Sequence, residues 1–185
     1  RPDWVVDPDG LVAPDTVAAV KGSPRRELLL DLQSNHALPK AQYHVRVRVA
    51  ATDPAALASV SQPQIQFNPA YQTLAVHEAA VWREGRKCDR LLGARIEVMR
   101  REANLDKAMI DGSQTLMAVL SDVQIGDVVE VAYTVEGDNP IFEGRIGHVL
   151  DLASHDQVDH LHLRLVAPRE RKLALRPLAT TIEPE

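Results

Sequence analysis

The chain has 185 residues, of which 45% are hydrophobic and 25% are charged, an ordinary composition for a globular protein. Its formal net charge of −5 predicts no basic surface for nucleic acid or anionic lipid. Cys88 is the only cysteine, which excludes an intramolecular disulfide. No apolar run reaches the roughly 20 residues that a membrane-spanning helix needs. We therefore expect a globular chain that binds no nucleic acid and spans no membrane.

Both ends of the sequence suggest a piece of a longer protein. The chain opens at Arg1 without a methionine or an apolar signal segment, so we expect that any export signal has been removed. We interpret residues 1–26 as an N-terminal extension, 27–178 as one β-sandwich domain, and 179–185 as a linker to a downstream domain that is missing here.

Alternation of apolar and polar side chains predicts strands along most of the chain. In residues 43–49 the valines share one face, and His44, Arg46 and Arg48 share the other. Residues 27–32 would pair with this strand as a hairpin. The same pattern predicts further strands at 64–67, 73–83, 90–99, 114–120, 129–136, 144–152, 160–166 and 171–178.

Helices are expected to be few and short. Asp53 is a candidate N-cap, and Pro54 then occupies the first helical position before an alanine-rich run to residue 60. A weaker pattern covers residues 15–20. With about nine to ten strands at short spacing, the sequence predicts an all-β fold, a two-layer antiparallel β-sandwich with one or two short helices.

Glycines lie between the alternating runs, where tight turns often need a positive φ that glycine adopts at little cost. This prediction applies to Gly85, Gly112, Gly126 and Gly137. In the same turns we expect Asp127 and Asp138 to accept hydrogen bonds from backbone amides, and Pro69 and Pro140 to end strands.

Three fragments carry a family resemblance. Residues 65–77 (IQFNPAYQTLAVH) are similar to the pattern F-D-P-x-Y-Q-x-L-x-x-H, residues 82–91 resemble an R-D-G hairpin, and residues 111–142 hold the third match. Their order and spacing resemble a bacterial domain of unknown function found just upstream of transglutaminase-like domains. The positions that carry the resemblance are Asn68, Pro69, Tyr71, Gly85, Asp111, Gly112, Gly126, Asp127, Tyr133, Asn139 and Pro140.

The resemblance implies an N-terminal β-sandwich in an exported protein, followed by a papain-like Cys-His-Asp domain that is absent from this chain. It implies no activity for the sandwich itself, because the role of the resembled domain is not established. Most of the matching positions also have turn-forming chemistry, so we interpret them as residues that specify the fold.

Candidate reactive or metal-binding groups are few. Cys88 follows a hairpin turn and lacks the sequence context of a catalytic thiol, so we interpret it as a spectator. His155, His160 and His162 are weak candidates for zinc, with His160 and His162 on one strand face, but a third fixed ligand is missing. Calcium binding by Asp151, Asp156 and Asp159 is disfavoured, because the run lacks a regular loop motif. We expect no cofactor.

The sequence thus favours a non-catalytic binding or scaffolding domain of an exported, transglutaminase-like multidomain protein. Its partner would be the downstream domain or another envelope protein, in a periplasmic or extracellular location. The alternative is a glycan- or peptide-binding module of the cell envelope. A third hypothesis is an enzyme that uses Cys88 or the histidine group.

Overall fold

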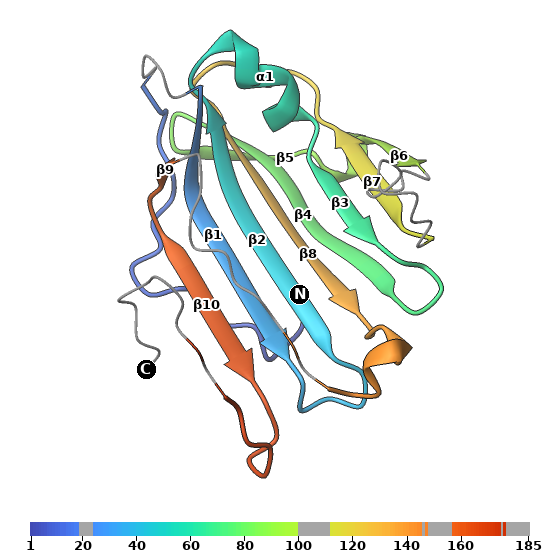
Figure 1. Ribbon diagram of the computed structural model, residues 1–185. Coiled ribbons are helices and arrows are strands. Elements are labelled where there is room, and N and C mark those ends of the chain that lie inside the picture. Colours follow the sequence, from blue (N-terminus) through green and yellow to red (C-terminus); the bar gives the residue numbers. More distant parts are fainter. Residues whose placement is uncertain (19–23, 100–111, 146, 148–156, 175, 177–185) are drawn as a thin grey trace.

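The computed structural model describes residues 1–18, 24–99, 112–145, 147, 157–174 and 176, and this part of the chain is dominated by strands (Figure 1). A seven-stranded sheet has the order β10–β1–β2–β8–β4–β5, with β9 also paired to β1, and a three-stranded sheet has the order β3–β7–β6. The strands are β1 (Arg25–Asn35), β2 (Gln42–Ala51), β3 (Gln64–Phe67), β4 (Thr73–Arg83), β5 (Arg86–Asp89), β6 (Arg95–Met99), β7 (Gln114–Val119), β8 (Val128–Glu136), β9 (Gln157–Val158) and β10 (Leu161–Val166). The predicted all-β class is confirmed.

The centre of the large sheet is built from the two most regularly alternating segments. β2 pairs with β8 in antiparallel register, which places Val47 opposite Val131 and Val49 opposite Val129. β4 lies on the other side of β8 and brings Val81 opposite Val129. Because side chains alternate between the faces of a strand, these cross-strand rows form one continuous apolar face.

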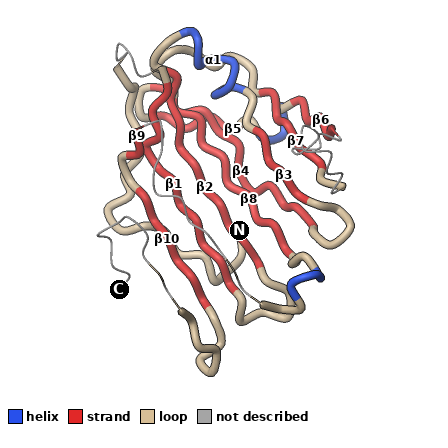
Figure 2. The backbone as a smooth tube through the Cα atoms, in the orientation of Figure 1, coloured by secondary structure: helices blue, strands red, loops and turns tan. Residues whose placement is uncertain are grey.

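A helix and the small sheet cover part of this apolar face. Helix α1 (Pro54–Ser61) begins where Asp53 accepts a hydrogen bond from the Ala55 amide, with Pro54 at the first position, as expected. Its buried residues Ala56 and Val60 pack with Ile65 of β3 into one core cluster together with the valines of the large sheet. Figure 2 shows the resulting layers, with α1 at one end of the strands.

The turn after β8 shows why glycine is required there. Gly137 has φ +114°, and a Cβ atom at this position would lie 2.1 Å from the carbonyl oxygen of Tyr71. Gly85, Gly112 and Gly126 also have positive φ, so the backbone prediction is confirmed at all four glycines. This close approach of the backbone holds the loop before β4 against the end of β8.

The strand predicted at residues 90–99 is confirmed for 95–99 only, and its expected place as the return strand of a hairpin is wrong. The return strand is the shorter β5, which pairs with β4. The chain then makes a 3-10 turn, η1 (Leu91–Gly93), and enters β6, which pairs with β7 in the small sheet. Alternation within a strand indicates which side chains share a face, but it does not indicate which sheet the strand joins.

Other predicted elements also need correction. Residues 15–18 form no helix, and residues 171–174 form no strand. β9 and β10 run parallel to β1, so the large sheet is mixed rather than purely antiparallel. Most of the strand predicted at 144–152 lies outside the described residues, although residues 144 and 145 are not in a strand.

Candidate functional site: the polar face of the large sheet

The face of the large sheet opposite the core carries polar side chains, most of which are nevertheless buried. We call it the polar face and define it by residues that alternate with the apolar rows on β1, β2, β8 and β10: Asp31, Gln33, His44, Arg46, Arg48, Glu130, Thr134, His162 and Arg164. Glu130 is 0% exposed, and Asp31 and His44 are each 1% exposed. Residues 1–18, the N-terminal segment, contact this face through the hydrogen bonds described below. The two strand faces are therefore both covered over the middle of the sheet.

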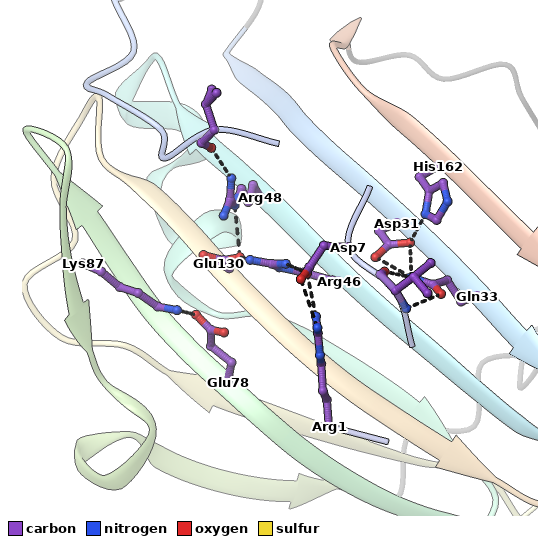
Figure 3. Close-up of polar contacts among 12 residues, drawn as sticks. Arg1, Asp7, Asp31, Gln33, Arg46, Arg48, Glu78, Lys87, Glu130 and His162 are labelled. Carbon is purple, nitrogen blue, oxygen red and sulfur yellow. Dashed lines mark hydrogen bonds and ion pairs between the residues drawn. The ribbon is translucent and has the colours of Figure 1, made fainter. Parts of the chain in front are cut away.

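Glu130 is the centre of the polar face (Figure 3). One carboxylate oxygen accepts hydrogen bonds from Arg46 Nε at 2.5 Å and from Arg48 Nε at 3.0 Å. The other oxygen accepts from Trp82 Nε1 on β4 at 2.5 Å. Buried carboxylates are tolerated only when their charge is paired and their lone pairs are used, and both conditions are met here.

The charges around Glu130 extend in two directions. The Arg48 guanidinium lies 5.4 Å from the centre of the Trp82 ring, and Lys87 lies 5.5 Å from the same ring. Lys87 also forms an ion pair with Glu78. The network thus joins β2, β8, β4 and β5 through side chains, in addition to their backbone hydrogen bonds.

The pKa of Glu130 is lower than that of an ordinary glutamate. Burial alone would raise it, but the positive charges of Arg46 and Arg48 and the Trp82 hydrogen bond outweigh that effect. Glu130 is therefore ionised at neutral pH and holds two arginines on the face.

A second polar cluster lies on β1 and β10. Gln33 Nε2 donates to both oxygens of Asp31 at 3.0 Å. His162 Nδ1 lies 2.7 Å from Asp31 Oδ1, across the parallel pairing of the two strands. These contacts give the buried Asp31 carboxylate its partners, and they orient Gln33 toward the N-terminal segment.

Two histidines share the hydroxyl of Thr134. His44 Nδ1 lies 3.1 Å and His77 Nε2 lies 2.8 Å from Thr134 Oγ1. One hydroxyl can donate to one ring and accept from the other. Burial, followed by the charge of His77, lowers the pKa of His44 to about 4, so its ring is neutral at neutral pH. His77 reaches this face from the register shift between Val76 and Glu78, a β-bulge that the sequence pattern does not reveal.

The histidines predicted from sequence are only partly described. His155 lies outside the described residues, together with His148, Asp151 and Asp156. His162 contacts Asp31, whereas the backbone carbonyl of His160 accepts from the Leu30 amide at 2.9 Å. Within the described residues, no three His, Cys, Asp or Glu side chains are grouped so that they could hold a metal ion.

Cys88 is a free cysteine at the surface. It is exposed on the edge strand β5, opposite Val81 of β4. No hydrogen bond joins it to a histidine among the residues that the structure describes. That this chain is not an enzyme stays a prediction.

Most of the other residues that carry the family resemblance lie in turns. Asn68 Oδ1 accepts from the Ala70 amide at 3.0 Å, across Pro69, and Asn139 Oδ1 accepts from the Ile141 amide at 3.1 Å at the start of η3 (Pro140–Phe142). Pro140 thus begins a 3-10 turn. Tyr133 packs against the core, and Asp111 lies outside the described residues.

The two aspartates that were predicted to accept hydrogen bonds from turn amides have different partners. Asp127 accepts from the Gln124 amide at 2.8 Å and also from Arg83 at 2.9 and 2.7 Å. Asp138 instead accepts a hydrogen bond from the hydroxyl group of Tyr43. The ion pair of Asp127 with Arg83 ties the start of β8 to the end of β4.

Replacement of Glu130 tests the charge network. Glu130→Gln should lower the free energy of unfolding by about 3–5 kcal/mol, because Arg46 and Arg48 would stay buried without a counter-charge. The matched control is Glu97→Gln, which removes a pair with the exposed Arg95 and should change stability by less than about 1 kcal/mol. Denaturant unfolding measures both, and similar losses in the two variants would contradict a buried network.

The neutral His44 predicts a pH dependence. The pKa of His44 is about 4 in the folded chain and about 6.5 when unfolded, so only the unfolded chain gains a proton as the pH falls from 6.5 to 4. Stability should therefore decrease through this window, by up to roughly 3 kcal/mol for His44. His44→Gln should flatten the curve, whereas the control His160→Gln should not. A wild-type curve that is level between pH 6.5 and 5 would contradict this assignment.

No curated protein matches this chain in sequence. A crystal structure of a "putative protease" from Parabacteroides distasonis ATCC 8503 has a similar fold, with a TM-score of 0.50 and 13% sequence identity. The match covers 62% of this chain but only 23% of that protein. No helix in the described residues is long and apolar enough to cross a membrane.

The family comparison is more direct. Residues 40–185 match the sequence profile of a domain of unknown function, DUF3857. The match begins just before β2 and includes β2, β4 and β8, which carry the centre of the polar face. It extends over well more than half of the sequence, and the chain therefore belongs to the DUF3857 family of domains of unknown function.

Proposed function

We propose that this chain is a non-catalytic module of an exported multidomain protein, in which it docks and positions a neighbouring transglutaminase-like domain. The observation that carries this proposal is an apolar strip on the large sheet. Leu30 and Leu32 of β1 share a face with Leu161 and Leu163 of β10 and with Val45 of β2, as the strand registers require. All five side chains keep part of their surface accessible to solvent.

The strip lies on the same face as the core but beside it. The small sheet and α1 pack over β2, β4 and β8, and the described core clusters include none of these five residues. In Figure 1, β10 and β1 form the side of the large sheet that lies away from β3, β7 and β6. A contiguous apolar surface beside a well-packed core is typical of a surface that contacts another domain.

A neighbouring domain is a fitting occupant for two reasons. The structurally similar protein from Parabacteroides distasonis is much longer than the matched region, which accounts for 23% of it. The sequence pattern also resembles a domain found upstream of transglutaminase-like domains. Interfaces between domains of one chain commonly bury about 600–1,500 Å² and have moderate affinity. A surface of this kind would hold a catalytic domain in a fixed orientation without supplying a catalytic group.

Hydrogen exchange on the full-length gene product tests the proposal. Amides of β1 and β10 should exchange more slowly in the full-length protein than in the isolated 185-residue chain, because the neighbouring domain covers them. Leu163→Glu in the full-length protein should remove this extra protection, since a charge would be buried in the interface. The matched control is Leu92→Glu, which alters a side chain that is 100% exposed in η1.

Two results would overturn the proposal. One is equal exchange of β1 and β10 in the isolated chain and the full-length protein. The other is a full-length gene product without a Cys-His-Asp domain after residue 185.

A further inference from the structure

The polar face holds the N-terminal segment by an unusual type of contact. Residues 1–18 run across the sheet as loops and turns and contain no strand (Figure 2). Side chains of the sheet bind the segment mainly through its backbone. The segment, which turns at residues 3–4 and 9–10, is therefore bound by side chains of the sheet and is not paired as a further strand.

Gln33 provides the most specific of these contacts. Its side-chain oxygen accepts from the Val6 amide at 3.2 Å, and its side-chain nitrogen donates to the Val6 carbonyl at 2.6 Å. A primary amide that pairs with both the N–H and the C=O of one residue recognises the main chain and not a side chain. The same Gln33 nitrogen donates to Asp31, which fixes the orientation of the amide, and His162 in turn contacts Asp31.

Two arginines add further backbone contacts. Arg164 of β10 donates to the Trp4 carbonyl at 2.8 Å, and Arg48 of β2 donates to the Val12 carbonyl at 2.7 Å. Together with Gln33 they bind four backbone groups of the segment. Hydrogen bonds from a charged donor are stronger than those between neutral groups, so these contacts favour a main chain at this place over water.

Only a few side chains of the segment are buried. Val5, Pro8, Pro14 and Val17 are buried, whereas most residues between them are exposed. The sheet also binds one carboxylate of the segment. Asp7 accepts a hydrogen bond from Arg46 of β2 at 2.9 Å, and another from Arg1 of the segment itself at 2.6 Å. The indole of Trp4 also donates to Gln42 at 2.6 Å. The face thus binds a chain with small apolar anchors, an acidic residue and one indole.

We propose that the polar face is a peptide-binding surface for an acidic polypeptide segment of a partner protein that has no regular secondary structure, and that residues 1–18 are its tethered occupant. The anchors and the carboxylate define the ligand class, and the backbone contacts allow segments of different sequence to bind. This inference does not depend on the proposed domain docking, which uses the opposite face of the sheet.

Replacement of the tethered segment by a partner is energetically reasonable. The sheet holds it through a handful of hydrogen bonds and four small apolar anchors. The net contribution is roughly 0.5–1.5 kcal/mol for each hydrogen bond between neutral groups and about 1.5–3 kcal/mol for each one from an arginine. A tether of a few residues gives the segment an effective concentration in the millimolar range. A partner segment of similar affinity would compete when it is itself tethered or abundant.

The test uses the whole chain with a protease site placed between Ala18 and Pro24. After cleavage, a fluorescent peptide of residues 1–18 should exchange with the cut segment reversibly, with a dissociation constant on the order of 10 µM. Circular dichroism before and after exchange verifies that the sheet stays folded. Complete retention of the cut segment without exchange, in a folded chain, would show that it is a permanent part of the core and would overturn the proposal.

Peptide variants distinguish main-chain recognition from simple adhesion. N-methylation of Val6 removes the amide that Gln33 accepts from and should weaken binding about tenfold, equivalent to about 1.4 kcal/mol. N-methylation of the exposed turn residue Asp9 is the matched control and should change affinity less than about twofold. Equal affinities for the two peptides would contradict recognition by Gln33.

A last pair of measurements examines the partner class. A peptide that retains Trp4, Val5, Asp7, Pro8, Gly10, Pro14 and Val17 but has serine at the other exposed positions should bind within about threefold of the natural sequence, because the retained contacts and the backbone contacts dominate. Arg164→Met should weaken both peptides, and the exposed control Arg169→Met should weaken neither. Loss of binding by the serine-substituted peptide would restrict the face to this chain's own segment and refute a partner.

Discussion

The structure depends on one buried charge arrangement: Glu130, with Arg46 and Arg48, on the face of the sheet that lies away from the core. An uncompensated carboxylate at 0% exposure would be very costly, so the two guanidinium groups and the Trp82 indole must be present together. This requirement ties β2, β8 and β4 into one register. It also requires a cover that excludes water, which the N-terminal segment supplies.

In a simple sandwich the outer face of a sheet is exposed to water, whereas here the outer, polar face is also buried. Polar residues of β1 such as Asp31 and Gln33 are buried, while Leu30 and Leu32, which alternate with them, keep part of their surface accessible. The polar residues can be buried because they are hydrogen-bonded. The leucines stay partly accessible because the small sheet covers β2, β4 and β8 and not β1. The polar face is then suited to recognising a main chain, and the leucine strip is suited to contact with another domain.

Much of the fold could be predicted from local pattern. The β1–β2 hairpin, α1 with its Asp53 cap, β4 and β8 follow from alternation and turn chemistry. The transfer of residues 95–99 to the small sheet and the parallel pairing of β10 could not, because both depend on distant partners. The candidate site was also missed. Arg48 and Glu130 alternate with valines and therefore resemble a solvated face, and only the three-dimensional pairing and the cover by residues 1–18 reveal that they are buried.

The central claim is that Arg48 and Glu130 interact inside a sealed face. A double-mutant cycle measures it directly, with Arg48→Leu, Glu130→Leu and the double variant compared by denaturant unfolding. We predict that the double variant is at least about 2 kcal/mol more stable than the sum of the single effects implies, because each single variant leaves a buried charge unpaired. A coupling below about 0.5 kcal/mol, as for exposed ion pairs, would show that the face is open to water and would contradict this account.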